Sequence, residues 1–272
     1  MSFLSIRDLH KSFPTPKGRV SVLDGLNLEV EEAEFVCIVG CSGSGKTTLV
    51  SLIAGLIEAD AGKISLAGEA IRGPGPDRGI VFQNYSLLAW MTVFENVYLA
   101  VDAVWPERSR EHKRRRAMDL IRMVNLGAAA EKRPGQLSGG MRQRVAVARG
   151  LAMDPKVLLL DEPFSALDAL TRATLQDELA RIWMSERKTV LMITNDVDEA
   201  ILLSDRIFPL SPGPGARLGA GLRVDIPRPR VRRRLSLDPH YQSARRELVG
   251  FLARHRSAPN EPLEAVEMAV AS

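Results

Sequence analysis

A glycine-rich stretch at residues 40–48 has the residue types and the spacing needed to hold phosphate groups. Gly40 is followed, after four intervening residues, by Gly45, Lys46 and Thr47, which is the pattern of a phosphate-binding loop. In such a loop the backbone N–H groups form a nest for phosphate oxygens, and the next helix adds its positive end. We expect Lys46 to reach the β- and γ-phosphates and Thr47 to bind Mg²⁺. The predicted nucleotide-binding residues here are Gly40, Cys41, Ser42, Gly43, Ser44, Gly45, Lys46, Thr47 and Thr48.

An apolar run at residues 157–160 ends in two acids, Asp161 and Glu162. A carboxylate at the end of a buried parallel strand lies near the ligand site of such a sheet. Asp161 is therefore predicted to help hold Mg²⁺ through water, and Glu162 to orient or deprotonate a water that attacks the nucleotide. The alternative is a solvated strand end without a role in catalysis.

The pattern around these motifs predicts the elements that position them. Apolar runs at 35–39, 79–82, 157–160 and 189–193 indicate buried strands, and helical spacing follows at 47–57, 170–187 and 197–203. Strands that alternate with helices favour a mainly parallel sheet covered on both faces. Alternating residues at 3–30 predict short antiparallel strands, and one more helix is predicted at 239–254.

Changes of character along the chain predict three parts. A nucleotide-binding core with an antiparallel β subdomain is expected at 1–85 and 153–210, and a helical subdomain at 86–152. Residues 211–272 are expected to form a C-terminal extension of loops, short strands and the helix at 239–254, with a disordered end.

The chain has a net charge of +4, and much of the excess of basic residues lies in two clusters, at residues 108–116 and 223–234. Clustered arginines are compatible with nucleic acid or anionic lipid headgroups, but neither cluster interleaves aromatic side chains for base stacking. A solvated helix face and a basic tail are the favoured interpretations.

Cys37 and Cys41 lack nearby ligand partners, which favours packing roles in a reducing compartment. No apolar run approaches the roughly 18 residues that cross a bilayer, so we expect a cytoplasmic protein.

Four motifs in a fixed order carry a family resemblance. The phosphate loop, LSGGM at 137–141, RQRVAVARGL at 142–151 and LLLDEPFSALD at 158–168 resemble those of ABC-type ATPases. The resemblance covers residues 3–235 and implies an α/β fold. That fold has a P-loop (RecA-like), mainly parallel sheet core, an antiparallel β subdomain and an inserted α-helical ABC subdomain. It also implies ATP and Mg²⁺ as ligands and a head-to-tail pair of subunits that sandwiches two nucleotides.

The same resemblance implies roles for residues outside the phosphate loop. Gln83 would sense Mg²⁺ and the attacking water, and Phe13 would stack on adenine. Asp168 would belong to a loop that crosses the dimer interface. Residues of the signature that would contact the γ-phosphate bound to the opposite subunit are Ser138, Gly139 and Gly140.

Asn195 departs from most of the family, which has His at this position of the TNDVDEA segment, although Asn is also seen in the nitrate group that the chain resembles. Three interpretations stay open. The Asn amide, which can also donate a hydrogen bond, replaces the His in a working site. Alternatively the site binds ATP, hydrolyses it poorly and depends on a different paired subunit, or the register is shifted and another residue acts.

Within the family, the chain resembles separate ATP-binding subunits of the nitrate, sulfonate and taurine import group, and nitrate subunits most of all. The segments RPGQLSGGM, VYLAVDAV and MITNDVDEAILLSDRIFPLSPGP carry this resemblance. It implies nitrate uptake, with sulfonate, taurine or cyanate as alternatives. A regulatory module switched by nucleotide, and an ATPase acting on DNA or ribosomes, are the other classes considered.

The importer resemblance also implies partners. A second ATP-binding subunit, identical or paralogous, would complete the nucleotide sites, and integral-membrane permease subunits would dock on the segment at 83–97. A periplasmic solute-binding protein would act indirectly, nucleic acid is not expected, and the location would be the cytoplasmic face of the inner membrane. Residues that either dock the permease or pack within the helical block are Tyr85, Leu87, Leu88 and Trp90.

Overall fold

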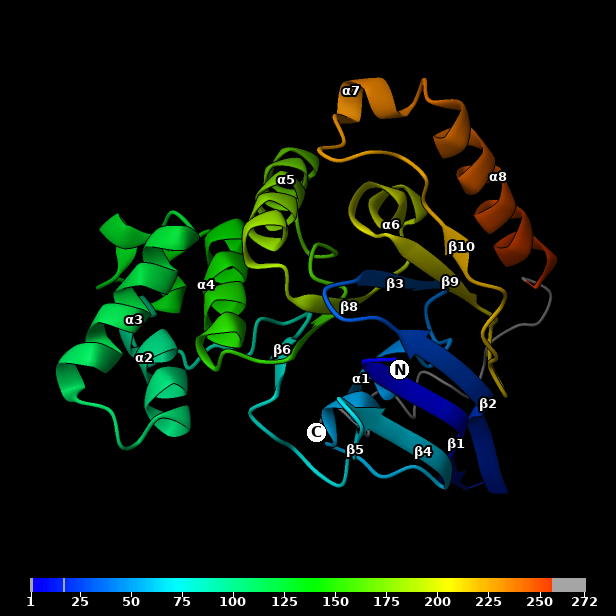
Figure 1. The fold of residues 1–272 in the computed structure, drawn as a ribbon, viewed down its shortest axis with the longest axis horizontal. Helices are drawn as coiled ribbons and strands as arrows, with labels where there is room; N and C mark the ends of the chain where they lie inside the picture. Colours follow the sequence, from blue (N-terminus) through cyan, green and yellow to red (C-terminus); the bar gives the residue numbers. More distant parts are fainter. Residues whose placement is uncertain (1, 17, 256–272) are drawn as a thin grey trace. The chain divides into compact units, whose positions relative to one another are not determined.

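The computed structural model, drawn in Figure 1, describes residues 2–16 and 18–255. The chain divides into two compact units. The first unit comprises residues 1–74 and 191–272, and the second comprises residues 75–190. The chain end predicted to be disordered lies, from residue 256 onward, outside the described residues. The three-part division stays a prediction.

An antiparallel sheet opens the first unit. Its strands β1 (Leu4–Thr15), β2 (Gly18–Val30), β4 (Ala61–Leu66) and β5 (Glu69–Ala70) lie in the order β2-β1-β4-β5. Leu4 lies opposite Val30 and Ile6 opposite Leu28 in the register of β1 and β2, and all four side chains are buried. Alternate residues thus face the core, as the period of a strand requires. The predicted antiparallel pairing is confirmed, but β1 and β2, with 12 and 13 residues, are longer than the short strands expected.

Parallel strands form the other layer of the first unit. β3 (Phe35–Gly40) pairs in parallel with β9 (Arg206–Leu210), and β10 (Leu222–Arg223) adds an antiparallel edge. Every residue of β3 is buried, which is typical of a parallel strand covered on both faces. Burial raises the pKa of the Cys37 thiol well above its ordinary value, which keeps it protonated as a packing residue.

Helices of the first unit follow its strands. α1 (Lys46–Ala54) comes after the glycine-rich loop, and α6 (Val197–Leu203) follows β8 (Thr189–Thr194), a strand that begins in the second unit and ends in the first. α1 ends three residues before the predicted limit because Gly55 caps it through its N–H group. The helix predicted at 239–254 is confirmed as α8 (Pro239–Arg254), which packs on α6 and β9.

The basic C-terminal segment is more ordered than predicted. It forms a short helix, α7 (Arg232–Leu235), that was not expected from the sequence. Arg228 and Arg230 are half-buried and donate hydrogen bonds to backbone carbonyls at the end of α6. The expectation of a solvated basic tail is therefore wrong for these two residues, because the orphan carbonyls of a helix end recruit guanidinium donors.

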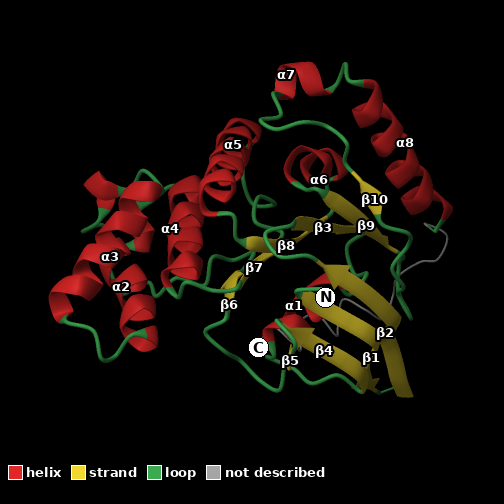
Figure 2. Cartoon of the chain, viewed as in Figure 1, coloured by secondary structure: helices red, strands yellow, loops and turns green. Residues whose placement is uncertain are grey.

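The second unit consists of two parallel strands and a group of helices, with the helices prominent in Figure 2. β6 (Arg78–Val81) pairs in parallel with β7 (Val157–Asp161). Helices α2 (Val93–Val104), α3 (Arg110–Met123) and α4 (Gly139–Ala152) pack on one another, and α5 (Ala169–Glu186) contacts α4. Short 3₁₀ turns at Gly127–Ala129 and Pro134–Gln136 connect α3 to α4.

Local sequence explains why α2 begins where it does. The Thr92 side chain accepts a hydrogen bond from the backbone N–H of Glu95, and the Glu95 carboxylate accepts one from the N–H of Thr92. This capping box satisfies two orphan donors at the helix start. Val93, Val97 and Val101, four residues apart, are fully buried and form the inner face of the helix.

In the described part of the chain, no helix is long and apolar enough to cross a membrane.

Candidate nucleotide site

The predicted phosphate loop connects β3 to α1 in the first unit. Gly45, the residue before α1, has φ of 86°, and a Cβ there would lie 2.7 Å from Val22 Cγ1. Only glycine therefore fits this turn without strain. The Lys46 ammonium donates to the carbonyl oxygens of Gly40 at 3.1 Å and Cys41 at 2.9 Å. These bonds hold the Lys46 side chain against the loop, where it is predicted to bind phosphate.

Ser44 supplies a second sign that this loop is a ligand cradle. Its side chain is 1% exposed, and its hydroxyl has no hydrogen-bond partner within the described residues. A buried hydroxyl without a partner is costly and asks for an explanation. Phosphate oxygens would accept a hydrogen bond from this hydroxyl.

The predicted ligands of the nucleotide's magnesium ion are a hydroxyl, an amide oxygen and a carboxylate, from Thr47, Gln83 and Asp161. Hard oxygen donors of this kind suit Mg²⁺.

Phe13, the predicted adenine-stacking residue, lies on β1 with one face partly covered. The Lys11 ammonium lies 5.1 Å from the centroid of the Phe13 ring. The Asp60 carboxylate accepts hydrogen bonds from the Ser12 hydroxyl and backbone N–H, both at 2.7 Å. The hydrogen bond from the Ser12 side chain is the main cause that lowers the pKa of Asp60 to about 2. Asp60 thus anchors the part of β1 that carries Phe13. This role of Asp60 was not predicted from the sequence.

Asn195 lies in the first unit, between the end of β8 and the start of α6. Its side chain is exposed, whereas Thr194 before it is buried. Asp196 caps α6 by accepting hydrogen bonds from the backbone N–H groups of Asp198 at 2.9 Å and Glu199 at 3.1 Å. An exposed amide next to a fixed helix start can donate to a ligand, as the working-site interpretation of Asn195 requires.

The two acids predicted for hydrolysis lie at the end of β7 in the second unit. Asp161 is the last residue of this strand and is 3% exposed. Glu162 follows with φ of 42°, a left-handed conformation that costs energy in a residue with a Cβ. Backbone strain of this kind is concentrated at functional sites.

Gln83 is connected to Glu162 through Ser165. The Gln83 amide donates to the Ser165 hydroxyl at 3.2 Å, and that hydroxyl donates to the carbonyl oxygen of Glu162 at 3.0 Å. The structure therefore brings the predicted Gln83 and Glu162 into one short hydrogen-bonded chain. Ser165 was not singled out from the sequence, since a lone Ser in a turn carries no specific signal.

The predicted signature residues form the start of α4. Ser138 is exposed and caps the helix, accepting a hydrogen bond from the Met141 N–H at 3.3 Å. A Cβ on Gly140 would lie 2.5 Å from Thr171 Cγ2, so glycine lets α4 approach α5 closely. A Cβ on Gly139 would be 3.2 Å from Leu167, a tighter contact than usual. The helix start thus presents an exposed hydroxyl on a closely packed backbone.

Asp168 lies beyond the Glu162 turn and caps α5. Its carboxylate accepts hydrogen bonds from the N–H groups of Leu170 at 3.1 Å and Thr171 at 3.0 Å. Hydrogen bonding by the Thr171 side chain, followed by its backbone, lowers the pKa of Asp168. Asp168 is therefore an ionised and exposed cap at neutral pH, and its dimer-interface role stays a prediction.

The four residues named as docking or packing candidates differ in exposure. Trp90 is 68% exposed, whereas Tyr85, Leu87 and Leu88 are half-buried. The Arg142 guanidinium lies 5.5 Å from the Tyr85 ring centroid. Tyr85 therefore packs against α4, and Trp90 is the candidate whose side chain is accessible.

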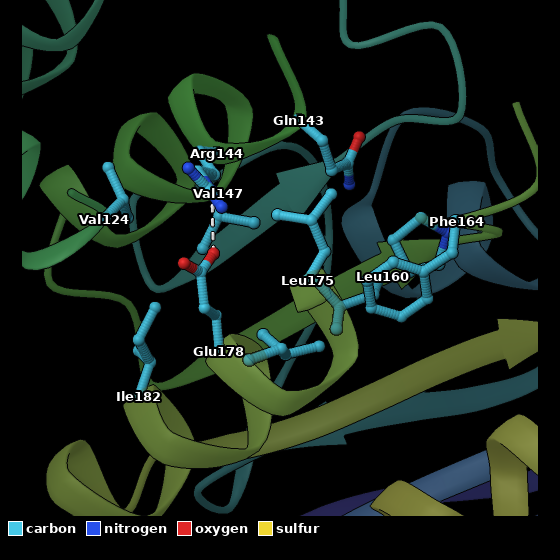
Figure 3. A pocket seen from close by; sticks show the side chains of 11 residues that line it. Val124, Gln143, Arg144, Val147, Leu160, Phe164, Leu175, Glu178 and Ile182 are labelled. Atoms are coloured by element: carbon cyan, nitrogen blue, oxygen red, sulfur yellow. Dashed lines mark hydrogen bonds and ion pairs between the residues drawn. The ribbon is translucent and has the colours of Figure 1, made fainter. Parts of the chain in front are cut away.

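A pocket between α4 and α5 is lined in part by Pro163 and Phe164, which directly follow Glu162 in the chain (Figure 3). Its cavity of about 20 Å³ is lined largely by apolar side chains, among them Leu160, Phe164 and Leu175. An ion pair between Arg144 and Glu178, 2.7 Å apart, marks one side. Gln143 also lines the pocket, and both polar atoms of its amide are without a hydrogen-bond partner in the described structure. No sequence pattern singles out Gln143.

Comparisons with known proteins agree on one family. A family model described as ABC transporter matches residues 23–165. The bicarbonate transport ATP-binding protein CmpD of Synechococcus elongatus is 50% identical over 250 residues, covering 92% of this chain and 90% of the relative. The nitrate import ATP-binding protein NrtD of Synechococcus elongatus is 47% identical over 252 residues, covering 93% and 92%.

A solved structure matches the fold. It is a dimeric ATP-binding cassette in a post-hydrolysis state bound to ADP and Pi, with a TM-score of 0.73 and 30% sequence identity. The match covers 82% of this chain and 99% of that chain. The predicted fold class, a P-loop α/β core with an antiparallel sheet and a helical subdomain, is confirmed.

Proposed function

Because the chain belongs to the ABC transporter family and is an ABC-type ATPase, we propose that it powers the import of nitrate or bicarbonate. The observation that carries this proposal is the identity of about half to nitrate and bicarbonate ATP-binding proteins over nine tenths of both chains. Nitrate was predicted from the sequence, and the relatives add bicarbonate. Both are small planar oxyanions with a single negative charge.

The site residues support a division of work in hydrolysis. The loop at 40–48, with Lys46 and the buried Ser44 hydroxyl, would bind the phosphates, and Phe13 would stack on the base. When bound, Mg²⁺ would neutralise phosphate charge, held by oxygens of Thr47, Asp161 and Gln83. Glu162 would accept a proton from the attacking water, and Gln83 would fix the Glu162 turn through Ser165.

A pair of ATP-binding subunits completes this proposal. Ser138, Gly139 and Gly140 at the exposed start of α4 would contact the γ-phosphate bound by the second subunit, since a helix N-terminus attracts anions. Asp168 would face the partner at the same interface. The pair would act on integral-membrane permease subunits, with Trp90 as an accessible docking side chain, at the cytoplasmic face of the inner membrane. A periplasmic solute-binding protein would deliver the anion.

Uptake measurements test the transported substrate. In cells that lack the gene for this chain, the wild-type gene should restore uptake of isotopically labelled nitrate or bicarbonate, and a Lys46→Ala variant should restore neither. The anion whose uptake returns identifies the substrate. Failure of the wild type to restore either one, with the protein expressed, contradicts the importer proposal.

Asn195 supports a second candidate function, a subunit that binds ATP and hydrolyses it poorly. An Asn amide is shorter than imidazole and cannot carry a charge. Comparing ATP hydrolysis by the wild type and Asn195→His separates the two. If the wild type does not hydrolyse ATP and Asn195→His does, the result favours the poorly hydrolysing subunit. Robust hydrolysis by the wild type excludes it.

A further inference from the structure

Helix α6 is held at both ends by side chains from the C-terminal part of the chain. It spans Val197–Leu203, directly after Asn195. All the residues concerned belong to the first unit. The family match ends at residue 165, before α6 and the residues that contact it.

Two arginines bind the C-terminal end of α6. The Arg230 guanidinium donates to the carbonyl oxygens of Ile201 and Ser204, both at 2.7 Å. The Arg228 guanidinium donates to the Leu203 carbonyl at 2.6 Å and to the Asp205 carboxylate at 2.8 Å. Burial lowers the pKa of Arg230 to about 10, so it stays charged at neutral pH. These donors satisfy carbonyls that a helix end leaves without intrahelical partners.

Two side chains of α8 bind the first turn of α6. The Asp198 carboxylate oxygen Oδ1 accepts a hydrogen bond from the Tyr241 hydroxyl at 2.7 Å and from Arg245 Nε at 2.8 Å. Burial and the Asp198 hydrogen bond raise the pKa of Tyr241 to about 12. The phenol is therefore a permanent donor at physiological pH. Charge-assisted hydrogen bonds are stronger than neutral ones, but both side chains of the Arg245–Asp198 pair are 52% exposed, so solvent screens part of this attraction.

Asn195 is positioned by its fixed neighbours. On the strand side, the Thr194 hydroxyl donates to the Glu199 carboxylate at 2.6 Å and accepts from the Asp196 N–H at 3.1 Å. On the helix side, Asp196 binds the N–H groups of Asp198 and Glu199. A shift of α6 therefore moves the backbone of Asn195 with it.

We propose that residues 226–245 form a clamp that positions Asn195 for hydrolysis, with Arg228, Arg230, Tyr241 and Arg245 as positioning residues. The proposal rests on the proposed function, because it requires that Asn195 act on the bound nucleotide. An Asn amide is shorter than an imidazole and reaches less far. A short donor tolerates little displacement, since a misplacement of about 1 Å can cost two orders of magnitude in rate. Firm support of α6 compensates for that short reach.

The test compares variants of the full chain in ATP hydrolysis and in ATP binding. Arg245→Gln should lower kcat 3- to 10-fold and leave the Kd for ATP within twofold, because the phosphate loop is untouched. Arg245→Lys should recover at least half of the lost kcat. Arg246→Gln is the matched control, since Arg246 is the exposed neighbour on the same helix, and should behave as the wild type.

Combination with Asn195→Ala decides whether the clamp acts through Asn195. If it does, adding Arg245→Gln to Asn195→Ala lowers kcat no further, because coupled residues are not additive. Additive losses, or a loss of ATP binding together with kcat, overturn the clamp. Asn195→Ala lowering kcat while Arg245→Gln does not also refutes the clamp, but leaves the role of Asn195 intact. An Asn195→Ala variant with wild-type kcat instead contradicts the role given to Asn195 in the proposed function.

Discussion

Gln143 offers an opportunity to stabilise the chain with one substitution. The side chain lies on α4, is 1% exposed and faces the pocket between α4 and α5 (Figure 3). Neither its amide nitrogen nor its amide oxygen has a hydrogen-bond partner among the described residues. Its pocket neighbours are mainly apolar, as in the case of Leu160 and Phe164. Replacing Gln143 by Met keeps a similar length and volume and removes both buried polar atoms.

The expected gain follows from the cost of burying an unsatisfied polar group. Each such group costs about 1–3 kcal/mol, and a volume-conserving core substitution loses less than about 1.5 kcal/mol by imperfect fit. The difference predicts that Gln143→Met stabilises the protein by roughly 1–2 kcal/mol. At about 2–4 °C per kcal/mol for a chain of this size class, the Tm should rise by roughly 2–8 °C.

Thermal unfolding followed by circular dichroism measures this change, and Gln176→Met provides the matched control. Gln176 lies on α5 in the same unit and is 2% exposed, but it engages in a polar interaction. The same substitution should therefore lower the Tm there. The two variants should move the Tm in opposite directions.

A lower Tm for Gln143→Met, by the equivalent of 1 kcal/mol or more, would refute this reasoning. Such a result would mean that the Gln143 amide is satisfied, for instance by water in the cavity. The cavity of about 20 Å³ has room for one water, but a buried water needs two to four polar partners. Most of its lining is apolar, and the Arg144 and Glu178 side chains that also line it are already paired with each other, which is why we expect stabilisation.

Three further predictions follow from individual contacts. Hydrogen bonds lower the pKa of Asp60 from 3.8 to about 2, so its stabilising contribution is complete above pH 3.8 and is lost as the pH falls through about 2. Between pH 5 and pH 2, the free energy of unfolding measured in urea should fall by about 1 kcal/mol more in the wild type than in Asp60→Asn. This value is reduced to allow for solvent screening of the carboxylate. Gly140→Ala should destabilise by about 1–3 kcal/mol because its Cβ meets Thr171 at 2.5 Å, whereas the Cβ of Gly135→Ala meets nothing within 4 Å and should cost far less. Phe13→Ala should raise the KM for ATP about fivefold and leave kcat unchanged, as loss of about 1 kcal/mol of base stacking implies; an unchanged KM would remove Phe13 from the site.

Much of this fold was predictable because its determinants are local. Gly45 and Lys46 stand between an apolar run and a helical pattern, and the strand, loop and helix form there. The run that ends in Asp161 is equally clear, because a buried parallel strand has no polar residue until its end. The helix beginning at Pro239 follows from its capping Asp238 and its apolar spacing.

Other features could not be read from the sequence because they depend on contacts between distant residues. Arg230 looked like part of a solvated basic run, yet it binds carbonyls nearly thirty residues earlier in the chain. Asp60 is an ordinary turn residue until β1 places Ser12 beside it. The left-handed conformation of Glu162 likewise has no local signature, because only the surrounding fold can hold a residue with a Cβ in that conformation.

ATP hydrolysis by Glu162→Gln tests the central claim most directly. The substitution keeps the size of the side chain and removes its basicity, and Glu131→Gln, an exposed position in the same unit, is the control. We predict a loss of at least about 100-fold in kcat with ATP binding intact, the scale of a missing general base. Hydrolysis by Glu162→Gln at the wild-type rate would contradict the assignment of Glu162 and the mechanism built on it.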